Sequence, residues 1–317
     1  MCADIEAPIF IPGNASRLRG ELRYNASLAK YVSWQTGGNA DQVYKPADLD
    51  DLAVYLQALP RDLPVYCLGL GSNLLVRDGG VRGAVVLLHG ALRELRLEEK
   101  QAEFGLIFAG AGVALPKLAR FAAGHNLVSA EFMAGIPGTV GGALTMNAGC
   151  YGGETWQIAV RALTIDRNGR LRQRERDEYA LGYRHVQLRS AEEEWFAGAW
   201  FALPVGNGAL SRSAIRELLR RRIESQPLGQ PNAGSVFRNP ENDFAARLID
   251  ACGLKGKAIG GAQVSTKHAN FIVNTASASA ADIEELIEFV VAEVATQTGV
   301  ILQCEVRMIG ERLGGSV

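Results

Sequence analysis

Glycines cluster between residues 135 and 153, and this cluster constrains the fold more than any other feature of the sequence. Seven of the 36 glycines fall in this window, whereas an even spread over the 317 residues would put about two there. Glycine loses the most backbone entropy on folding, so a cluster indicates a backbone that something approaches closely. Amides without side-chain cover suit a flat, anionic cofactor such as a dinucleotide.

A second glycine-bearing loop, Gly69-Leu70-Gly71-Ser72-Asn73, follows an apolar strand that we expect over residues 65–70. The loop does not fit the dinucleotide fingerprint G-x-G-x-x-G, because Leu74 stands where the third glycine would be. Its successive amides are able to hold a pyrophosphate, although a tight turn between two strands explains the same residues. The sequence contains no G-x-x-x-x-G-K-[ST] run, which excludes an ordinary P-loop.

The composition excludes several classes of protein. Hydrophobic residues make up 48% and charged residues 21% of the chain, which is typical of a folded globular protein. A net charge of −1 argues against a dedicated binder of nucleic acid or anionic membranes. The five cysteines are widely spaced and the four histidines show no metal-ligand spacing, so we expect a reducing, cytoplasmic location and no metal. We also expect no signal peptide and no membrane span.

Hydrophobic periodicity predicts mixed helices and strands without strict alternation, which favours an α+β fold of two lobes. Ser279 and Asp282 resemble a capping box before a helix that ends at Gly299, and Asn168-Gly169 predicts a hairpin between two strands. Further helices are expected over residues 116–123, 211–222 and 243–252, and further strands over 84–88, 106–109, 201–205 and 300–309. The predicted organisation is a first region over 1–208 with its core at about 36–206, a second domain over 209–299, and a C-terminal strand within 300–317.

Three polar residues stand out, although each has a simple structural explanation. Ser235 lies in a polar loop without the G-x-S-x-G pattern of a hydrolase, and a loop serine is usually a cap or turn residue. Glu305 belongs to an alternating stretch, which is typical of the solvated face of a half-buried strand. Arg184 follows Tyr183, and an isolated arginine is normally a surface charge.

Taken together, the conspicuous segments resemble the bacterial UDP-N-acetylenolpyruvoylglucosamine reductases. The resemblance runs from about Ser33 to Gly310, and the segments follow the order of the family. They are Thr36-Gly37-Gly38-Asn39-Ala40, Gly69-Leu70-Gly71-Ser72-Asn73-Leu74-Leu75-Val76, Gly135-Ile136-Pro137-Gly138-Thr139-Val140-Gly141-Gly142, Asn147-Ala148-Gly149, Tyr183-Arg184, Asn232-Ala233-Gly234-Ser235-Val236-Phe237-Arg238-Asn239-Pro240, Gly260-Gly261-Ala262-Gln263-Val264-Ser265-Thr266-Lys267-His268-Ala269 and Glu305-Val306-Arg307-Met308-Ile309-Gly310.

This resemblance implies a two-lobed FAD-binding domain of the vanillyl-alcohol-oxidase type, a smaller α+β substrate-binding domain, and a last strand that returns to the first lobe. It implies that NADPH reduces FAD and that the reduced flavin passes a hydride to the enolpyruvyl group of a UDP-sugar. The product would be UDP-N-acetylmuramate for peptidoglycan synthesis, with consequences for cell shape and division.

The family's functional residues carry over by position. Ser235 resembles the proton donor, Arg184 the catalytic arginine and Glu305 the catalytic glutamate. The positions that resemble flavin contacts are Gly69, Gly71, Ser72, Asn73, Gly135, Ile136, Pro137, Gly138, Asn147, Ala148 and Gly149. The positions that resemble contacts to the nucleotide sugar are Tyr183, Arg238, Asn239, Lys267 and His268.

The chain also departs from the family pattern. Ser225 stands where many relatives have a lysine, so Arg220, Arg221 or Arg222 is expected to supply the charge, and Cys150 replaces a more usual alanine. The chain resembles the family's shorter form. Two rival functions stay open at this point: an FAD-dependent oxidase of the same fold, and an inactive protein that binds flavin or a nucleotide sugar.

Overall fold

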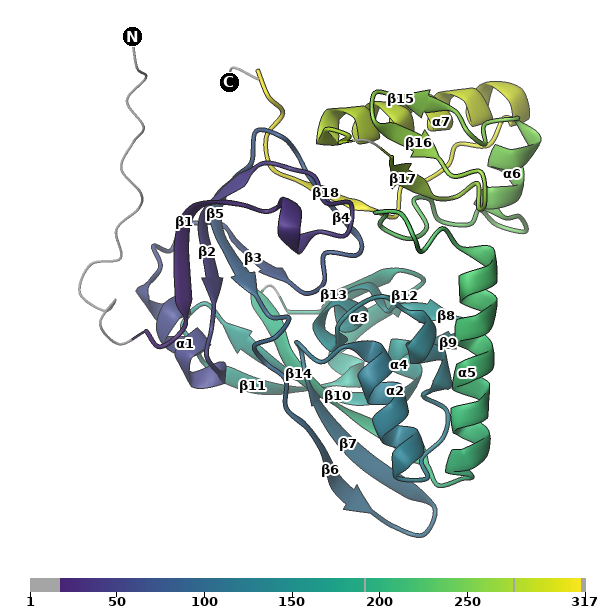
Figure 1. Cartoon of the computed structure of the whole chain (residues 1–317). Coiled ribbons are helices and arrows are strands. Elements are labelled where there is room, and N and C mark those ends of the chain that lie inside the picture. Colours follow the sequence, from purple (N-terminus) through teal and green to yellow (C-terminus); the bar gives the residue numbers. More distant parts are fainter. Residues whose placement is uncertain (1–17, 191, 276, 315–317) are drawn as a thin grey trace. The chain divides into compact units, whose positions relative to one another are not determined.

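The computed structural model describes residues 18–190, 192–275 and 277–314 (Figure 1). Contacts between residues divide this part of the chain into two compact units. The first unit contains residues 18–25, 41–69 and 83–220, and the second contains residues 26–40, 70–82 and 221–314. Among the described residues, no helix combines the length and the apolar character that a membrane crossing requires.

One helix and most residues of a four-stranded sheet belong to the first unit. The strand order is β1-β2-β5-β3, and the strands are β1 (Glu21–Ser27), β2 (Asn39–Lys45), β5 (Val81–Leu87) and β3 (Val65–Leu68). Strands β3 and β5 are parallel, with Val65 opposite Ala84. Helix α1 (Leu49–Ala58) begins after Asp48, whose carboxylate accepts a hydrogen bond from the Asp51 amide. Tyr44, Tyr55 and Leu56 pack in the core of this layer.

A five-stranded antiparallel sheet forms the larger part of the first unit. Its order is β11-β10-β14-β7-β6, and the strands are β11 (Leu171–Glu175), β10 (Ala159–Asp166), β14 (Glu194–Pro204), β7 (Phe104–Gly110) and β6 (Leu95–Lys100). Pairing of Ile165 with Leu171 confirms the hairpin predicted around Asn168-Gly169. Figure 1 shows three helices against this sheet: α2 (Leu115–Gly124), α3 (Val140–Met146) and α4 (Thr155–Ile158).

Two small hairpins complete the first unit. One joins β8 (Gly149–Cys150) to β9 (Gly153–Glu154), and the other joins β12 (Tyr179–Gly182) to β13 (His185–Leu188). The short helical turns η3 (Glu131–Gly135) and η4 (Arg176–Glu178) precede β8 and β12. The long helix α5 (Gly208–Ser225) confirms the helix predicted over 211–222 and extends beyond it at both ends.

The second unit is built around helix α7 (Ala280–Thr298). Its capping box at Ser279 and Asp282 and its C-cap at Gly299 confirm the prediction. A three-stranded sheet packs beside it in the order β15 (Ala258–Ile259), β16 (Ala262–Val264) and β17 (Ile272–Asn274). Helix α6 (Ala245–Ala251) contributes to the same hydrophobic core. The turn η2 (Ala29–Tyr31) leads to Trp34, which is fully buried and donates from Nε1 to the Ile272 carbonyl at 2.8 Å.

The predicted final strand over 300–309 is too long. Strand β18 covers only Arg307–Ile309 and pairs in parallel with β4 (Leu74–Val76). Before β18 the chain makes a single antiparallel bridge, between Cys304 and Phe237, so no continuous ladder forms. Burial still alternates, with Leu302 and Val306 buried and Gln303 exposed, which is why the pattern resembled a strand.

Candidate active site

The two glycine-bearing loops approach each other closely in the first unit. A Cβ atom at Gly69 would lie 2.4 Å from the hydroxyl oxygen of Thr139, so no larger residue fits there without a shift. The loop that carries Thr139 is fixed on both sides, because Leu115 N donates to Gly138 O at 3.0 Å and Val140 N donates to Val113 O at 2.9 Å. The end of β3 therefore abuts the 138–140 loop.

The hydroxyl of Thr139 is buried and has no hydrogen-bond partner among the described residues. A buried hydroxyl without a partner costs free energy, so such a group in a native fold requires an explanation. A bound anionic cofactor at these loops would supply an acceptor. The residues present therefore fit a dinucleotide such as FAD.

Some glycines of the 135–153 window serve the packing of the chain itself. A Cβ atom at Gly135 would lie 2.7 Å from Cε2 of Tyr151 and 3.0 Å from Sγ of Cys150, and one at Gly153 would lie 2.6 Å from the Phe132 ring. These glycines allow the β8–β9 hairpin to lie against η3. The cluster thus has an internal explanation in addition to any approach by a cofactor.

Arg184 lies in the two-residue turn between β12 and β13, and its backbone is left-handed with φ of +54°. Its guanidinium donates to the carbonyls of Gly149 at 2.8 Å and Asn147 at 3.5 Å. The Asn147 side chain in turn donates to Gly182 O at 3.2 Å. The structure therefore brings the predicted catalytic arginine together with the predicted flavin segment 147–149. Its neighbour Tyr183 is exposed, and the two side chains form a cation–π contact at 5.1 Å.

Ser235 and Glu305 come together in the second unit through their backbones. Glu305 N donates to Val236 O at 2.7 Å, and Arg238 N donates to Gln303 O at 2.9 Å. Ser235 is exposed, whereas Glu305 is half-buried. Asn73 joins the same group, because its side chain donates to Glu305 O at 3.2 Å and its carbonyl accepts from Arg307 N at 3.1 Å.

The predicted sugar-contacting residues of the second unit have defined surroundings. Asn239 accepts from Ala245 N at 3.1 Å at the start of α6, and Lys267 Nζ donates to Ile223 O at 2.6 Å. The His268 ring packs against Phe271, and burial lowers the pKa of the imidazole below its usual value. Its Nδ1 accepts from Asn270 N at 3.3 Å, as a neutral imidazole can.

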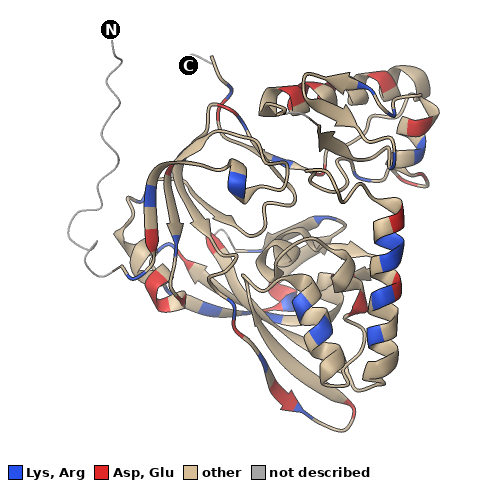
Figure 2. Ribbon diagram, viewed as in Figure 1, with Lys and Arg blue, Asp and Glu red and all other residues tan. Residues whose placement is uncertain are grey.

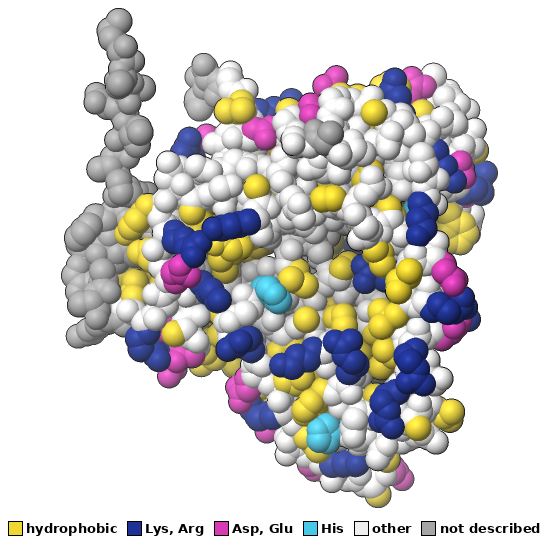
Figure 3. Space-filling view, viewed as in Figure 1, with side chains coloured by type: hydrophobic (Ala, Val, Ile, Leu, Met, Phe, Trp, Pro, Cys, Tyr) yellow, Lys and Arg dark blue, Asp and Glu magenta, His cyan; other side chains and the backbone are white. Residues whose placement is uncertain are grey.

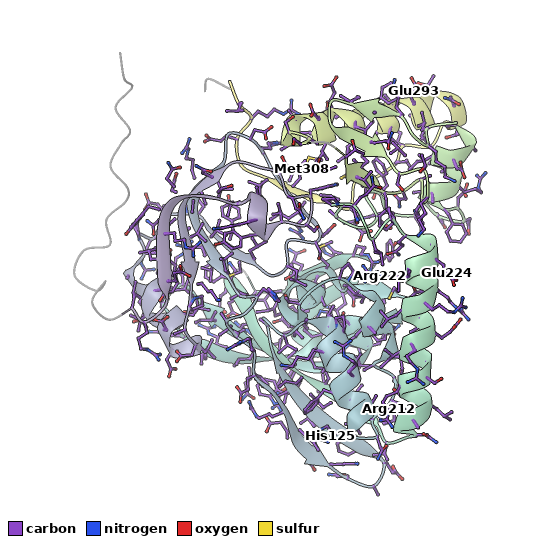
Figure 4. All side chains as sticks on the ribbon, viewed as in Figure 1. His125, Arg212, Arg222, Glu224, Glu293 and Met308 are labelled. Atoms are coloured by element: carbon purple, nitrogen blue, oxygen red, sulfur yellow. The ribbon has the colours of Figure 1, made fainter. Side chains whose placement is uncertain are left out.

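Helix α5 carries the arginines that were expected to compensate for Ser225. The ribbon in Figure 2 marks basic and acidic residues along this helix, and Figure 3 shows basic side chains gathered over α2 and α5. Arg212 lies near the start of α5 and Arg222 and Glu224 near its end (Figure 4). Arg220 pairs with Glu217 at 2.8 Å, and Arg222 donates to Gln226 at 3.0 Å.

Sequence reasoning passed over two residues of these groups. The sequence does not distinguish Thr139 from its neighbours in the 135–142 segment, since only the structure reveals that its hydroxyl lacks a partner among the described residues. Asn270 directly follows the quoted 260–269 segment, and its side chain contacts Phe237, 33 residues earlier. The only local signal for Asn270 is a polar residue next to an apolar strand, and this signal does not predict which residue Asn270 contacts.

Comparison with known proteins defines first a class of protein. The profile of an FAD binding domain matches residues 40–173, which include the loops around Gly69, Thr139 and Asn147. The profile described as the C-terminal domain of UDP-N-acetylenolpyruvoylglucosamine reductase matches residues 226–309, which include Ser235 and Glu305. The chain is thus a flavoprotein of α+β fold with a specialised C-terminal domain, which confirms the predicted fold class.

The relatives make the assignment more specific. The UDP-N-acetylenolpyruvoylglucosamine reductase of Thiobacillus denitrificans is 58% identical over 95% of both chains, and that of Nitrosospira multiformis is 57% identical over 92% of this chain and 90% of its own. The crystal structure of the Thermus caldophilus enzyme matches with a TM-score of 0.76 and 30% identity, covering 92% of this chain and 99% of that one. The chain belongs to the UDP-N-acetylenolpyruvoylglucosamine reductase family.

Proposed function

We propose that this chain reduces the enolpyruvyl group of UDP-N-acetylglucosamine enolpyruvate with electrons from NADPH, giving UDP-N-acetylmuramate. The observation that carries this function is the 58% identity to a reductase of that name over 95% of both chains, since it spans the flavin and the C-terminal regions together. The product is a precursor of peptidoglycan, so the activity belongs to cell-wall synthesis. It thereby bears on cell shape and division.

FAD held by the domain that matches residues 40–173 would supply the hydride chemistry that links NADPH to the enolpyruvyl double bond. The residues of this chain hold the cofactor and complete the reaction at the neighbouring carbon. We propose that Gly69, Gly71, Ser72 and Asn73, with residues 135–138 and 147–149, contact the flavin. The Thr139 hydroxyl supports this assignment, because it lies against Gly69 and has no hydrogen-bond partner among the described residues.

Hydride addition leaves negative charge on the carbon beside the substrate carboxylate. That carbon is a strong base, so a hydroxyl is acid enough to protonate it, and we assign this role to Ser235. Arg184 is proposed to stabilise the growing charge through its fixed guanidinium. Glu305 acts in the same step, either as a protonated acid or by orienting another donor.

The remaining proposed contacts hold the nucleotide sugar. Tyr183, Arg238, Asn239, Lys267 and His268 combine aromatic, cationic and amide groups, which suit a uracil, a diphosphate and a sugar. The described cysteines are all free thiols, and NADPH belongs to the same reducing environment. We therefore place the enzyme in the cytoplasm.

The test of this function separates the two half-reactions in a Ser235→Ala variant. Bleaching of the flavin by NADPH should keep its wild-type rate, while reoxidation by the enolpyruvyl substrate should fall by about 10²- to 10⁴-fold. Ser213→Ala, which alters an exposed serine of α5, is the matched control and should keep both rates. Reoxidation of Ser235→Ala at the wild-type rate would refute the proton-donor assignment.

The same experiment distinguishes the rival functions. An oxidase would be reduced by its own alcohol-like substrate and would not require NADPH. An inactive binding protein would bleach slowly or not at all, and no product would form. Incorporation of one solvent deuterium beside the carboxylate of the product, in D2O, would identify the protonated carbon.

A further inference from the structure

Asn270 makes an unusual paired contact with the segment that follows Ser235. Its side-chain Nδ2 donates to Phe237 O at 2.8 Å, and its Oδ1 accepts from Phe237 N at 2.9 Å. Its own carbonyl accepts from Val236 N at 2.9 Å. The side chain therefore pairs with a backbone residue as a neighbouring β-strand would. Asn270 is almost fully buried, so these bonds are protected from competition by water.

The residue directly before Ser235 gives the serine little restraint. Gly234 precedes it with φ of +74°, and no heavy atom lies within 4 Å of a Cβ built at Gly234. Its amide donates to Asn232 Oδ1 at 3.0 Å, which closes a local turn without joining another element. Long-range backbone restraints on this side lie farther from the serine, where the Pro231 carbonyl accepts from Asn274 N at 2.9 Å and Asn232 forms a bridge with Val273. The restraints nearest to Ser235 therefore come from the residues after it.

The same short segment also holds the Glu305 backbone. Val236 O accepts from Glu305 N, and Arg238 N donates to Gln303 O, so the 235–238 segment lies between Asn270 and the 303–305 segment. A movement of residues 236–237 would therefore displace both Ser235 and Glu305. Asn270 is the side chain that restrains this segment from the opposite side.

We propose that Asn270 is a positioning residue that holds the 235–237 segment so that the Ser235 hydroxyl is aimed at the carbon to be protonated. This inference rests on the proposed function of Ser235. In this role Asn270 contacts neither substrate nor cofactor and acts through the backbone of Val236 and Phe237. Proton transfer is sensitive to small displacements of the donor, so a loosened segment should slow this step in particular.

A purely structural role makes a different prediction. If Asn270 only stabilises the fold, its loss should lower the melting temperature and leave the rates of both half-reactions of the folded enzyme unchanged. Asn274 offers a matched control in the same unit, because its side chain also joins two backbone sites. Its Nδ2 donates to Trp34 O at 3.0 Å, and its Oδ1 accepts from Ala278 N at 2.9 Å.

The test is a double-mutant cycle on the holoenzyme with Asn270→Ala, Ser235→Ala and the combination. Asn270→Ala should slow reoxidation by the enolpyruvyl sugar about 10- to 100-fold and leave reduction by NADPH unchanged. In the Ser235→Ala background the same change should cause no further loss, because there is no hydroxyl left to position. Asn274→Ala should lower the melting temperature without changing either rate.

Two outcomes would overturn the inference without touching the proposed function. Asn270→Ala could reoxidise at the wild-type rate, or it could slow reoxidation equally with and without the Ser235 hydroxyl. If Ser235→Ala itself reoxidises normally, both the positioning role and the donor assignment fail. Asn270→Ser, which keeps one hydrogen-bonding group, replaces Asn270→Ala in the cycle if the latter does not fold.

Discussion

Arg184 occupies a backbone conformation that arginine rarely adopts. At φ of +54°, in a two-residue turn, its Cβ meets steric strain that glycine would avoid. Strain of about 1–3 kcal/mol at a non-glycine residue often marks a functional position, where the side chain is retained despite the cost. In this turn the guanidinium can donate to the carbonyls of Gly149 and Asn147, and these two hydrogen bonds fix the direction of the side chain.

Replacing Arg184 with glycine should separate function from stability. We expect the melting temperature to stay within a few degrees, because relief of strain offsets the lost hydrogen bonds, each worth about 0.5–1.5 kcal/mol. Reoxidation of the flavin by substrate should fall at least about 10²-fold, since a charge-stabilising donor is gone. Stopped-flow absorbance and thermal denaturation measure the two effects.

Asn25→Gly is the control for Arg184→Gly. It relieves a left-handed residue at φ of +44° in β1 and should leave both rates unchanged. Reoxidation by Arg184→Gly at the wild-type rate would remove Arg184 from the catalytic residues.

Individual residues were predictable from the sequence only where a motif names them. Ser235, Arg184 and Glu305 stand in segments that resemble a family, whereas local pattern alone favoured turn, surface and strand-face explanations. Thr139 and Asn270 depend on partners that lie far along the chain. Hydrophobic periodicity does not predict contacts between residues that are distant in sequence, so these two residues could be recognised only in the structure.

At the scale of elements, the end of β3 lies directly against the 138–140 loop. Gly69 permits it, because a Cβ there would lie 2.4 Å from the Thr139 hydroxyl. Gly69→Ala should push this loop away and weaken FAD binding about tenfold, with a smaller effect on the fold. The ratio of flavin to protein absorbance after dialysis measures the retention of FAD.

Gly124→Ala is the matched control for this change. No heavy atom lies within 4 Å of a Cβ at Gly124, and alanine is the better helix former at the end of α2. This variant should retain FAD like the wild type. If Gly69→Ala also retains FAD fully, the β3 loop is not part of the flavin site.

Long periodic elements were predictable, and short ones were not. Helices α5 and α7 and the β10–β11 hairpin follow from apolar spacing, capping residues and an Asn-Gly turn. The pairs β8–β9 and β12–β13 are only two to four residues long on each strand, which is too short for a period to emerge. The overlong prediction for 300–309 has the same origin, since alternating burial does not require a ladder.

At the scale of the whole molecule, the second unit gathers segments that are distant in sequence. Arg77 donates to both oxygens of Glu284 at 2.8 and 3.0 Å, and Arg312 donates to Glu284 at 2.7 Å. Asp78 accepts from the first amides of α7, Ala280 and Ala281. These contacts tie residues 77–78 and the C-terminal segment to α7. A single boundary along the sequence does not describe such interleaving, and the domain limits expected near 206–211 stay a prediction.

This cluster predicts a pH dependence of stability. The hydrogen bond from Arg77, followed by that from Arg312, lowers the pKa of Glu284, whose side chain is only 7% exposed. Its stabilising contribution is therefore complete above the usual glutamate pKa and is lost as the pH falls through the lowered value. Glu284→Gln should cost about 1–3 kcal/mol at pH 7, because partly exposed arginines lose a buried partner.

Urea denaturation at pH 7 and near pH 3 measures this difference. The gap between wild type and Glu284→Gln should shrink as the pH falls, because the wild-type carboxylate becomes protonated. Glu288→Gln is the control, since Glu288 pairs with Arg312 but is 63% exposed, and its effect should be small at both pH values. A Glu284→Gln gap that does not change with pH would contradict the ionic role of this carboxylate.

The proposed function requires that electrons pass from NADPH through FAD to an enolpyruvyl UDP-sugar. The most direct measurement is an anaerobic visible spectrum of the purified protein during addition of NADPH and then of UDP-N-acetylglucosamine enolpyruvate. The flavin bands should bleach with NADPH and return in full with the sugar. Flavin bands that bleach but stay bleached would contradict the assigned substrate. A protein that binds no flavin after reconstitution with FAD would contradict the assigned cofactor and, with it, the proposed function.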